Sequence, residues 1–270
     1  MNAIDGTPSG GVRRRGASND ASPAALEIHG LDKSFGGIHA VRGVSLQLPI
    51  GGRVAVIGPN GAGKTTLFRM IAGEVRPTAG RIRMLGHDVT DTNERSRSRL
   101  GLARTFQVSN LFRTCSVLEN VQIAAMASTR TRMKFWAPVP RRGPTAVRAR
   151  AALDRVRLSH RADALASDLS HGEQRQLELA IALVTDPRLI LFDEPAAGLS
   201  ASERVVLRGL LESLPPDISF LLIEHDMSLA FELTDQVLCL DNGSPIGYGT
   251  PDQIRADAII QSIYLGRRGA

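Results

Sequence analysis

The chain has 270 residues and is 43% hydrophobic, so it can bury a complete core and hold one or two domains. Its two cysteines give no disulfide framework, and no apolar stretch reaches the roughly 18 residues of a membrane span, as expected of a cytosolic globular protein. The net charge of +6 comes almost wholly from arginine. It reflects either a coding bias toward arginine or attraction to an anionic surface, and charge alone does not distinguish nucleic acid from lipid head groups.

The first third of the chain predicts a tail, a small sheet and one buried strand. Residues 1–24 are rich in Gly, Ser, Pro and Arg and lack the apolar core of a signal peptide, which predicts a disordered tail. Residues 26–31 and 41–48 alternate like strands, and residues 80–85 add a third, which predicts a small antiparallel sheet. The apolar, β-branched run at 53–57 predicts a buried strand.

Directly after that strand comes Gly58-Pro-Asn-Gly-Ala-Gly63-Lys64-Thr65, which matches the phosphate-binding pattern G-x-x-x-x-G-K-[S/T]. A helix is predicted over residues 65–72, so several backbone N–H groups and the helix dipole converge on one point. Lys64 adds a full positive charge there, and Thr65 offers a hydroxyl to a Mg²⁺ ion held by phosphates. The spacing therefore predicts a nucleoside triphosphate site.

The middle of the chain predicts helices around one irregular stretch. Ser116 and Glu119 form a capping box, which predicts a helix to about residue 127. Residues 130–142 combine prolines, Phe135, Trp136 and several arginines, and predict an irregular excursion. A further helix is predicted from Pro144 to about residue 158, because proline suits the first turn of a helix.

The second half predicts a parallel sheet. Apolar strands are predicted at 189–192, 219–224 and 236–240, and the helical segments between them are typical of βαβ units. Before them, Ser170 and Glu173 form another capping box. That helix start is either a plain cap or a second phosphate-binding N-terminus.

Two carboxylates end the strand at 189–192. Ligands of open α/β sheets lie beyond the carboxyl ends of strands, so Asp193 is expected near Mg²⁺ and Glu194 near an attacking water. The alternative is that Asp193 and Glu194 form only a solvated acidic turn. His225, after the next strand, is either a turn residue or a contact to the γ-phosphate, and Gln107 is either a surface residue or part of the site. Phe35 either packs in the core or stacks on a purine base.

Taken together, the motifs resemble those of an ATP-binding cassette (ABC) ATPase over residues 25–266. In chain order the matching segments are Phe35, residues 58–65, Gln107, Leu169-Ser-His-Gly-Glu173, residues 189–194, Ala197-Gly-Leu-Ser200 and His225. The resemblance implies an α/β fold: a P-loop NTPase (RecA-like) core with a parallel sheet, an antiparallel β subdomain and a helical subdomain inserted at 111–178. It also implies a dimer in which Ser170 and Gly172 read the partner's nucleotide.

The same resemblance implies the site residues and cofactors, ATP and Mg²⁺. ATP would contact Phe35, Gly58, Pro59, Asn60, Gly61, Ala62, Gly63, Lys64, Thr65, Thr66, Gln107, Ser170, Gly172 and Glu173. Mg²⁺ would be held by Thr65, Gln107 and Asp193. In hydrolysis, Glu194 would act as general base, His225 would sense the γ-phosphate and Lys64 would neutralise phosphate charge.

Within the family, the chain resembles the ATP-binding subunit of branched-chain amino-acid importers. The resemblance is carried by Arg104-Thr-Phe-Gln107, Asp193-Glu-Pro-Ala-Ala-Gly-Leu199, Leu222-Ile-Glu-His-Asp-Met227 and Ile263-Tyr-Leu-Gly266. Ser200, where cassettes commonly have Asp, and the basic N-terminal tail depart from the pattern.

The implied partners are a second cassette, identical or not, two integral-membrane permease subunits and, indirectly, a secreted solute-binding protein. The chain would then work peripherally at the cytoplasmic face of the cell membrane. Two alternatives are an importer ATPase for urea, amides or aromatic acids, and a nucleic-acid- or ribosome-associated cassette ATPase. Nucleic-acid- or ribosome-associated cassette ATPases usually carry two cassettes or a coiled-coil insertion. This sequence lacks both features, so no nucleic-acid partner is expected.

Overall fold

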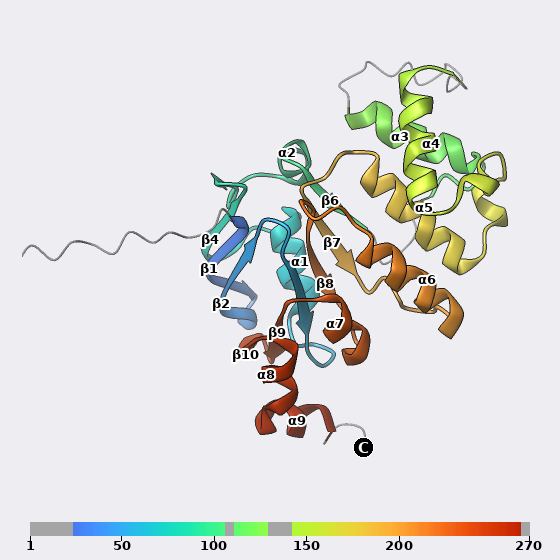
Figure 1. The fold of residues 1–270 in the computed structure, drawn as a ribbon. Helices are drawn as coiled ribbons and strands as arrows, with labels where there is room; N and C mark the ends of the chain where they lie inside the picture. The colour runs from blue at the N-terminus through green and yellow to red at the C-terminus, as the bar shows by residue number, and fades with distance from the viewer. Residues whose placement is uncertain (1–23, 106–110, 129–141, 266–270) are drawn as a thin grey trace, which may run out of the picture.

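A six-stranded sheet forms the centre of the fold, in the order β10-β9-β3-β8-β7-β6 (Figure 1). The computed structural model describes residues 24–105, 111–128 and 142–265, so residues 1–23 of the predicted tail, Gln107 and residues 130–141 lie outside it. The parallel strands are β3 (Arg53–Ile57), β6 (Leu102–Arg104), β7 (Leu189–Asp193), β8 (Ser219–Ile223) and β9 (Gln236–Asp241), and β10 (Ser244–Gly249) pairs antiparallel with β9. The four predicted strands of this sheet are present, whereas β6 and β10 were not predicted.

The second sheet is antiparallel, in the order β2-β1-β4-β5, as predicted for its three longer strands. They are β1 (Ala24–Phe35), β2 (Ile38–Pro49) and β4 (Ala79–Met84), with the short β5 (His87–Asp88) at the edge. β1 and β2 are longer than predicted because Gly36 and Gly37, with φ of +48° and +92°, close a two-residue hairpin between them.

Helices cover the parallel sheet and form a separate group at one end. The helices are α1 (Lys64–Ala72), α2 (Glu94–Arg99), α3 (Val117–Ser128), α4 (Pro144–Arg155), α5 (His171–Leu183), α6 (Ala201–Glu212), α7 (Met227–Leu233), α8 (Pro251–Ala256) and α9 (Ala258–Leu265). Figure 1 shows α3, α4 and the start of α5 together, away from the antiparallel sheet. None of these helices in the described part of the chain is long and apolar enough to cross a membrane.

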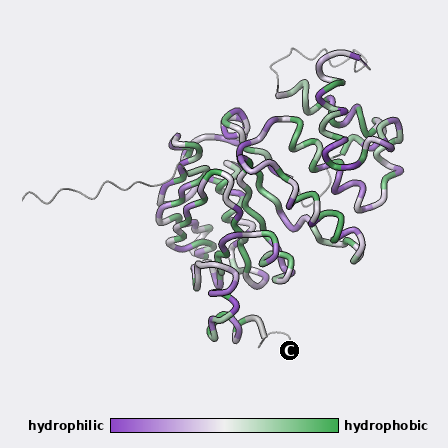
Figure 2. The backbone as a smooth tube through the Cα atoms, viewed as in Figure 1, coloured by the Kyte–Doolittle hydropathy of each residue, from purple (hydrophilic) through white to green (hydrophobic). Residues whose placement is uncertain are grey.

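The parallel strands are buried on both faces, which explains their nearly continuous apolar sequences. Side chains alternate along a strand, so Ile190 and Phe192 of β7 pack in the core that includes α3, α4 and α5. Leu189 and Leu191 point the other way, into the core that the sheet shares with α1 and the antiparallel sheet. In Figure 2 these strands form the hydrophobic centre of the molecule. The carboxyl ends of β3, β7 and β8 are therefore held on a rigid base.

Candidate active site

The loop between β3 and α1 forms one wall of a cavity of about 430 Å³. The cavity is lined by Ile38, His39, Ala40, Arg42, Asn60, Gly61, Ala62, Gly63, Lys64, Thr65, Thr66, Glu194, His225 and Asn242. Most of the predicted phosphate-loop residues are thus brought together with Glu194 and His225, although Glu194 follows Thr66 by 128 positions in the sequence. His39, Arg42 and Asn242 also line it, and no motif in the sequence identified them.

Lys64 is held inside the loop. Its Nζ donates hydrogen bonds to the carbonyl oxygens of Gly58 at 2.6 Å and Pro59 at 3.1 Å. Burial lowers the pKa of Lys64, and the nearby Glu194 and Asp193 carboxylates act in the opposite direction. The side chain is 5% exposed, so a fixed cation lies at the cavity wall. Such a charge, shielded from water, interacts strongly with phosphate.

The helix start behind Lys64 is also arranged for an anion. Gly63 has φ +96°, and a Cβ atom there would run into the carbonyl of Ala40, so only glycine allows this approach. No described side chain caps the N-terminus of α1, and its first turn holds no acidic residue. The first backbone N–H groups and the helix dipole therefore face the cavity without a competing carboxylate.

Two acidic residues lie at the end of β7: Asp193 is its last residue and Glu194 follows it. Asp193 pairs with Ile223 of β8, and Glu194 donates its backbone N–H to the Ile223 carbonyl at 3.0 Å. Glu194 has φ +51°, a left-handed conformation that is uncommon for residues other than glycine and concentrates at functional sites. Its Oε1 lies 2.6 Å from Nε2 of His225, which extends from the end of β8. The turn therefore aims a carboxylate and an imidazole at the same cavity.

Asp193 is 2% exposed, and its Oδ2 accepts a hydrogen bond from Nη2 of Arg104 at 3.1 Å. Burial raises the pKa of the Asp193 carboxyl, whereas the hydrogen bond and charge of Arg104 lower it. The chemistry of the donor set fits a Mg²⁺ ion that arrives with phosphates: a carboxylate and the Thr65 hydroxyl are hard oxygen ligands. Arg104 therefore contacts this site, and sequence reasoning assigned it no role of its own because its partner Asp193 is distant in the chain.

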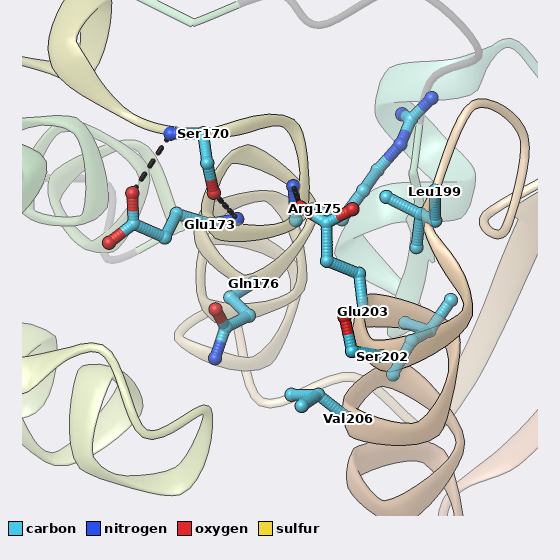
Figure 3. A pocket seen from close by; sticks show the side chains of 10 residues that line it. Ser170, Glu173, Arg175, Gln176, Leu199, Ser202, Glu203 and Val206 are labelled. Atoms are coloured by element: carbon cyan, nitrogen blue, oxygen red, sulfur yellow. Dashed lines mark hydrogen bonds between the residues drawn. The ribbon is translucent and has the colours of Figure 1, made fainter.

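The predicted signature residues lie at a different place (Figure 3). Ser170 caps α5: its hydroxyl accepts the Glu173 N–H, and the Glu173 carboxylate accepts the Ser170 N–H at 2.8 Å. The N–H of Gly172 donates to Oε1 of Glu203 in α6 at 2.8 Å. The same carboxylate accepts the backbone N–H of Ser200 at 2.9 Å. One side chain thus joins the starts of α5 and α6.

These residues line a second cavity of about 150 Å³, which shares no described residue with the cavity of the phosphate loop. The phosphate loop and the start of α5 therefore lie at two separate cavities in the described part of the chain.

Phe35 and Gln107 complete the predicted set. Phe35 is 47% exposed, so the core alternative for this residue is wrong. Its ring lies 4.8 Å from Nζ of Lys33, and Ile38, rather than Phe35, lines the described part of the cavity. Stacking of Phe35 on a base stays a prediction. Gln107 lies outside the described residues.

A phosphate loop between a parallel strand and a helix, with carboxylates at the end of another strand of the same sheet, defines a P-loop NTPase. Comparison with known proteins identifies the family within the P-loop NTPases. Residues 41–197 match the family described as ABC transporter. The chain belongs to this family and is its ATP-hydrolysing cassette.

Two relatives and one solved structure are similar over nearly their whole length. The high-affinity branched-chain amino acid transport ATP-binding protein BraF of Pseudomonas aeruginosa is 38% identical over 248 residues, 89% of this chain and 97% of BraF. LivG of Escherichia coli K12, of the same description, is 38% identical over 252 residues, 91% of this chain and 99% of LivG. The ADP-bound cassette MJ1267 of an ABC transporter has a TM-score of 0.80 at 28% identity, covering 90% of this chain and 99% of MJ1267.

Proposed function

We propose that this cassette energises the uptake of branched-chain amino acids, or related small solutes, through a separate permease. The proposal is carried by one observation: two branched-chain amino acid transport ATP-binding proteins are 38% identical to it over nearly their full length. In the same account, residues 25–266 form the ATPase unit, with a helical subdomain at 111–178. The chain would bind peripherally to the cytoplasmic face of the cell membrane.

We assign the chemical roles from the contacts around the cavity and, for Gln107, from the sequence resemblance to ABC ATPases. Lys64 neutralises charge on the β- and γ-phosphates, and the N-terminus of α1 binds the phosphate oxygens. Thr65, Asp193 and Gln107 hold Mg²⁺, which neutralises further phosphate charge when bound. Glu194 accepts the proton of the attacking water. The 2.6 Å contact with His225 orients that carboxylate and brings the imidazole toward the γ-phosphate.

A second cassette completes the site in this proposal. Ser170 and Gly172 line a cavity separate from that of Lys64, which supports a role toward a nucleotide held by another subunit. Binding of that nucleotide would require Glu203 to share or release the Gly172 N–H, which it occupies at 2.8 Å. The partner is either a second copy of this chain or a sister cassette.

Two permease subunits and a secreted solute-binding protein complete the importer, and we propose that Gln107 couples the cassette to the permease. Gln107→Ala should weaken the stimulation of ATPase activity by permease more than it weakens ATP binding. If the substitution weakened the stimulation and ATP binding equally, or weakened neither, the result would argue against coupling.

Reconstitution tests the cargo. The chain would be co-purified with its candidate permease subunits and placed in lipid nanodiscs. ATPase activity would then be measured with the candidate binding protein and one solute at a time. We expect stimulation by leucine, isoleucine or valine. Stimulation only by urea, an amide or an aromatic acid would contradict the proposed cargo but support the proposed role as an importer ATPase. Stimulation only by nucleic acid would refute the importer.

A further inference from the structure

Arg104 lies at the end of β6, and its guanidinium sits between two carboxylates. Nη2 donates to Oδ2 of Asp193 at 3.1 Å, and Nη1 pairs with Oε1 of Glu74. The Arg104 side chain is 15% exposed and that of Asp193 is 2% exposed, so their ion pair is largely shielded from water. An ion pair in this setting is far less screened than one on the surface.

Backbone pairing fixes both ends of this contact. Arg104 pairs with Leu191 in the register of β6 and β7, and the next residue, Thr105, donates its N–H to the Leu191 carbonyl at 3.0 Å. The Asp193 backbone is held in turn by its pairing with β8. The side chains of Arg104 and Asp193 therefore meet from adjacent, rigid strands.

The other carboxylate lies just after the helix of the phosphate loop. Glu74 follows α1, and its backbone N–H donates to the carbonyl of Arg69 at 3.0 Å. Its Oε2 also accepts a hydrogen bond from Nε of Arg69 at 3.0 Å. Arg104 thus connects the C-terminal end of α1 to the end of β7. Since α1 begins at Lys64, the phosphate loop lies at one end of this helix and a partner of the guanidinium, Glu74, lies just past the other end.

We propose that Arg104 is a positioning residue for the metal site. By holding Oδ2 of Asp193, the guanidinium restricts the orientation of the carboxylate that would hold the Mg²⁺ arriving with ATP. Groups that orient a ligand commonly contribute tenfold to a hundredfold in metal affinity. The inference rests on the proposed function, because it takes Asp193 as a metal ligand.

Metal affinity, rather than activity, tests this role. Mn²⁺ would be titrated into the protein saturated with AMP-PNP, and free Mn²⁺ would be followed by its EPR signal. Arg104→Met keeps an apolar stem of similar length and removes the guanidinium, so the apparent Kd for Mn²⁺ should rise about tenfold. Arg104→Lys keeps the charge without the planar fork and should raise it about threefold. Arg208→Met, which removes an exposed arginine of α6, is the matched control and should leave it unchanged.

A double-mutant cycle separates positioning from general support of the fold. If Arg104 acts through Asp193, Arg104→Met should change the Kd less than twofold when added to Asp193→Asn. A similar tenfold effect in both backgrounds would overturn the proposal, as would a wild-type Kd in Arg104→Met. Should Arg104→Met fail to fold, a wild-type Kd in Arg104→Lys would overturn it. If Asp193→Asn alone left the Kd unchanged, the assignment of Asp193 as metal ligand would fail instead.

Discussion

Replacement of Arg97 by methionine should destabilise the fold although Arg97 lies in a short, entirely polar helix. Arg97 is fully buried. Its Nη1 donates to the carbonyls of Met70 at 2.6 Å and Ile71 at 2.7 Å, and its Nη2 donates to that of Val89 at 2.6 Å. The guanidinium therefore satisfies carbonyls at the C-terminal end of α1, where a cation is also favoured by the helix dipole.

The magnitude follows from two opposing effects. Each hydrogen bond to a charged group contributes about 1.5–3 kcal/mol. Against this, burial lowers the pKa of Arg97 to about 10, so placing the charge there costs about 3 kcal/mol at about 1.4 kcal/mol per pKa unit. In the variant, Met70 O still accepts from the Gly73 N–H at 3.2 Å, which limits the loss. We expect Arg97→Met to reduce the free energy of unfolding by about 3 kcal/mol.

Thermal unfolding followed by circular dichroism measures this effect. About 3 kcal/mol corresponds to a fall in Tm of about 6–12 °C for a chain of this size. Arg99→Met is the matched control, because Arg99 belongs to the same helix but is exposed. Equal Tm values for the two variants would refute the reasoning that the buried guanidinium stabilises the end of α1.

Three further outcomes are expected. Lys64→Ala should abolish ATP turnover while the far-UV spectrum stays native, because the fixed cation at the phosphate site is lost; normal turnover would remove that role. Burial raises the pKa of the Cys239 thiol to about 12, so at pH 8 a disulfide reagent should modify only Cys115 in native protein and both thiols in denaturant. Gly80→Ala should lower Tm more than Gly86→Ala: both have φ near +85°, at +90° and +81°, but only at Gly80 would the Cβ meet a neighbouring strand. Equal Tm changes would show that backbone conformation alone matters.

The sequence predicted the parts of the fold that depend on local pattern. The apolar runs of β3, β7, β8 and β9 are bounded by clear turns, and they predict four strands of the parallel sheet. The helix expected from Pro144 to about residue 158 ends earlier, at Arg155, because Arg157 turns into a left-handed conformation with φ +59°. β6 was missed because it has three residues and no periodicity.

Tertiary contacts could not be predicted in the same way. The segment Glu94–Arg99 reads Glu-Arg-Ser-Arg-Ser-Arg, and nothing local distinguishes the buried Arg97 from its exposed neighbours. Glu203 was not singled out from the sequence, yet it caps the start of α6 and also accepts the Gly172 N–H, 31 positions away. Motif spacing located the phosphate-loop residues of the cavity because the loop fixes them locally, whereas the partners of Arg104 depend on strand order.

The most direct test of the account is the hydrolysis rate of Glu194→Gln. The amide keeps the shape of the side chain but is a far weaker base. Hydrolysis should fall by about 10²–10⁴ while Mg·ATP binding stays close to wild type, because Lys64 and Asp193 are unchanged. Glu212→Gln, on the exposed face of α6, should hydrolyse ATP normally. A folded Glu194→Gln protein that turns over ATP at the wild-type rate would contradict the assignment of the general base.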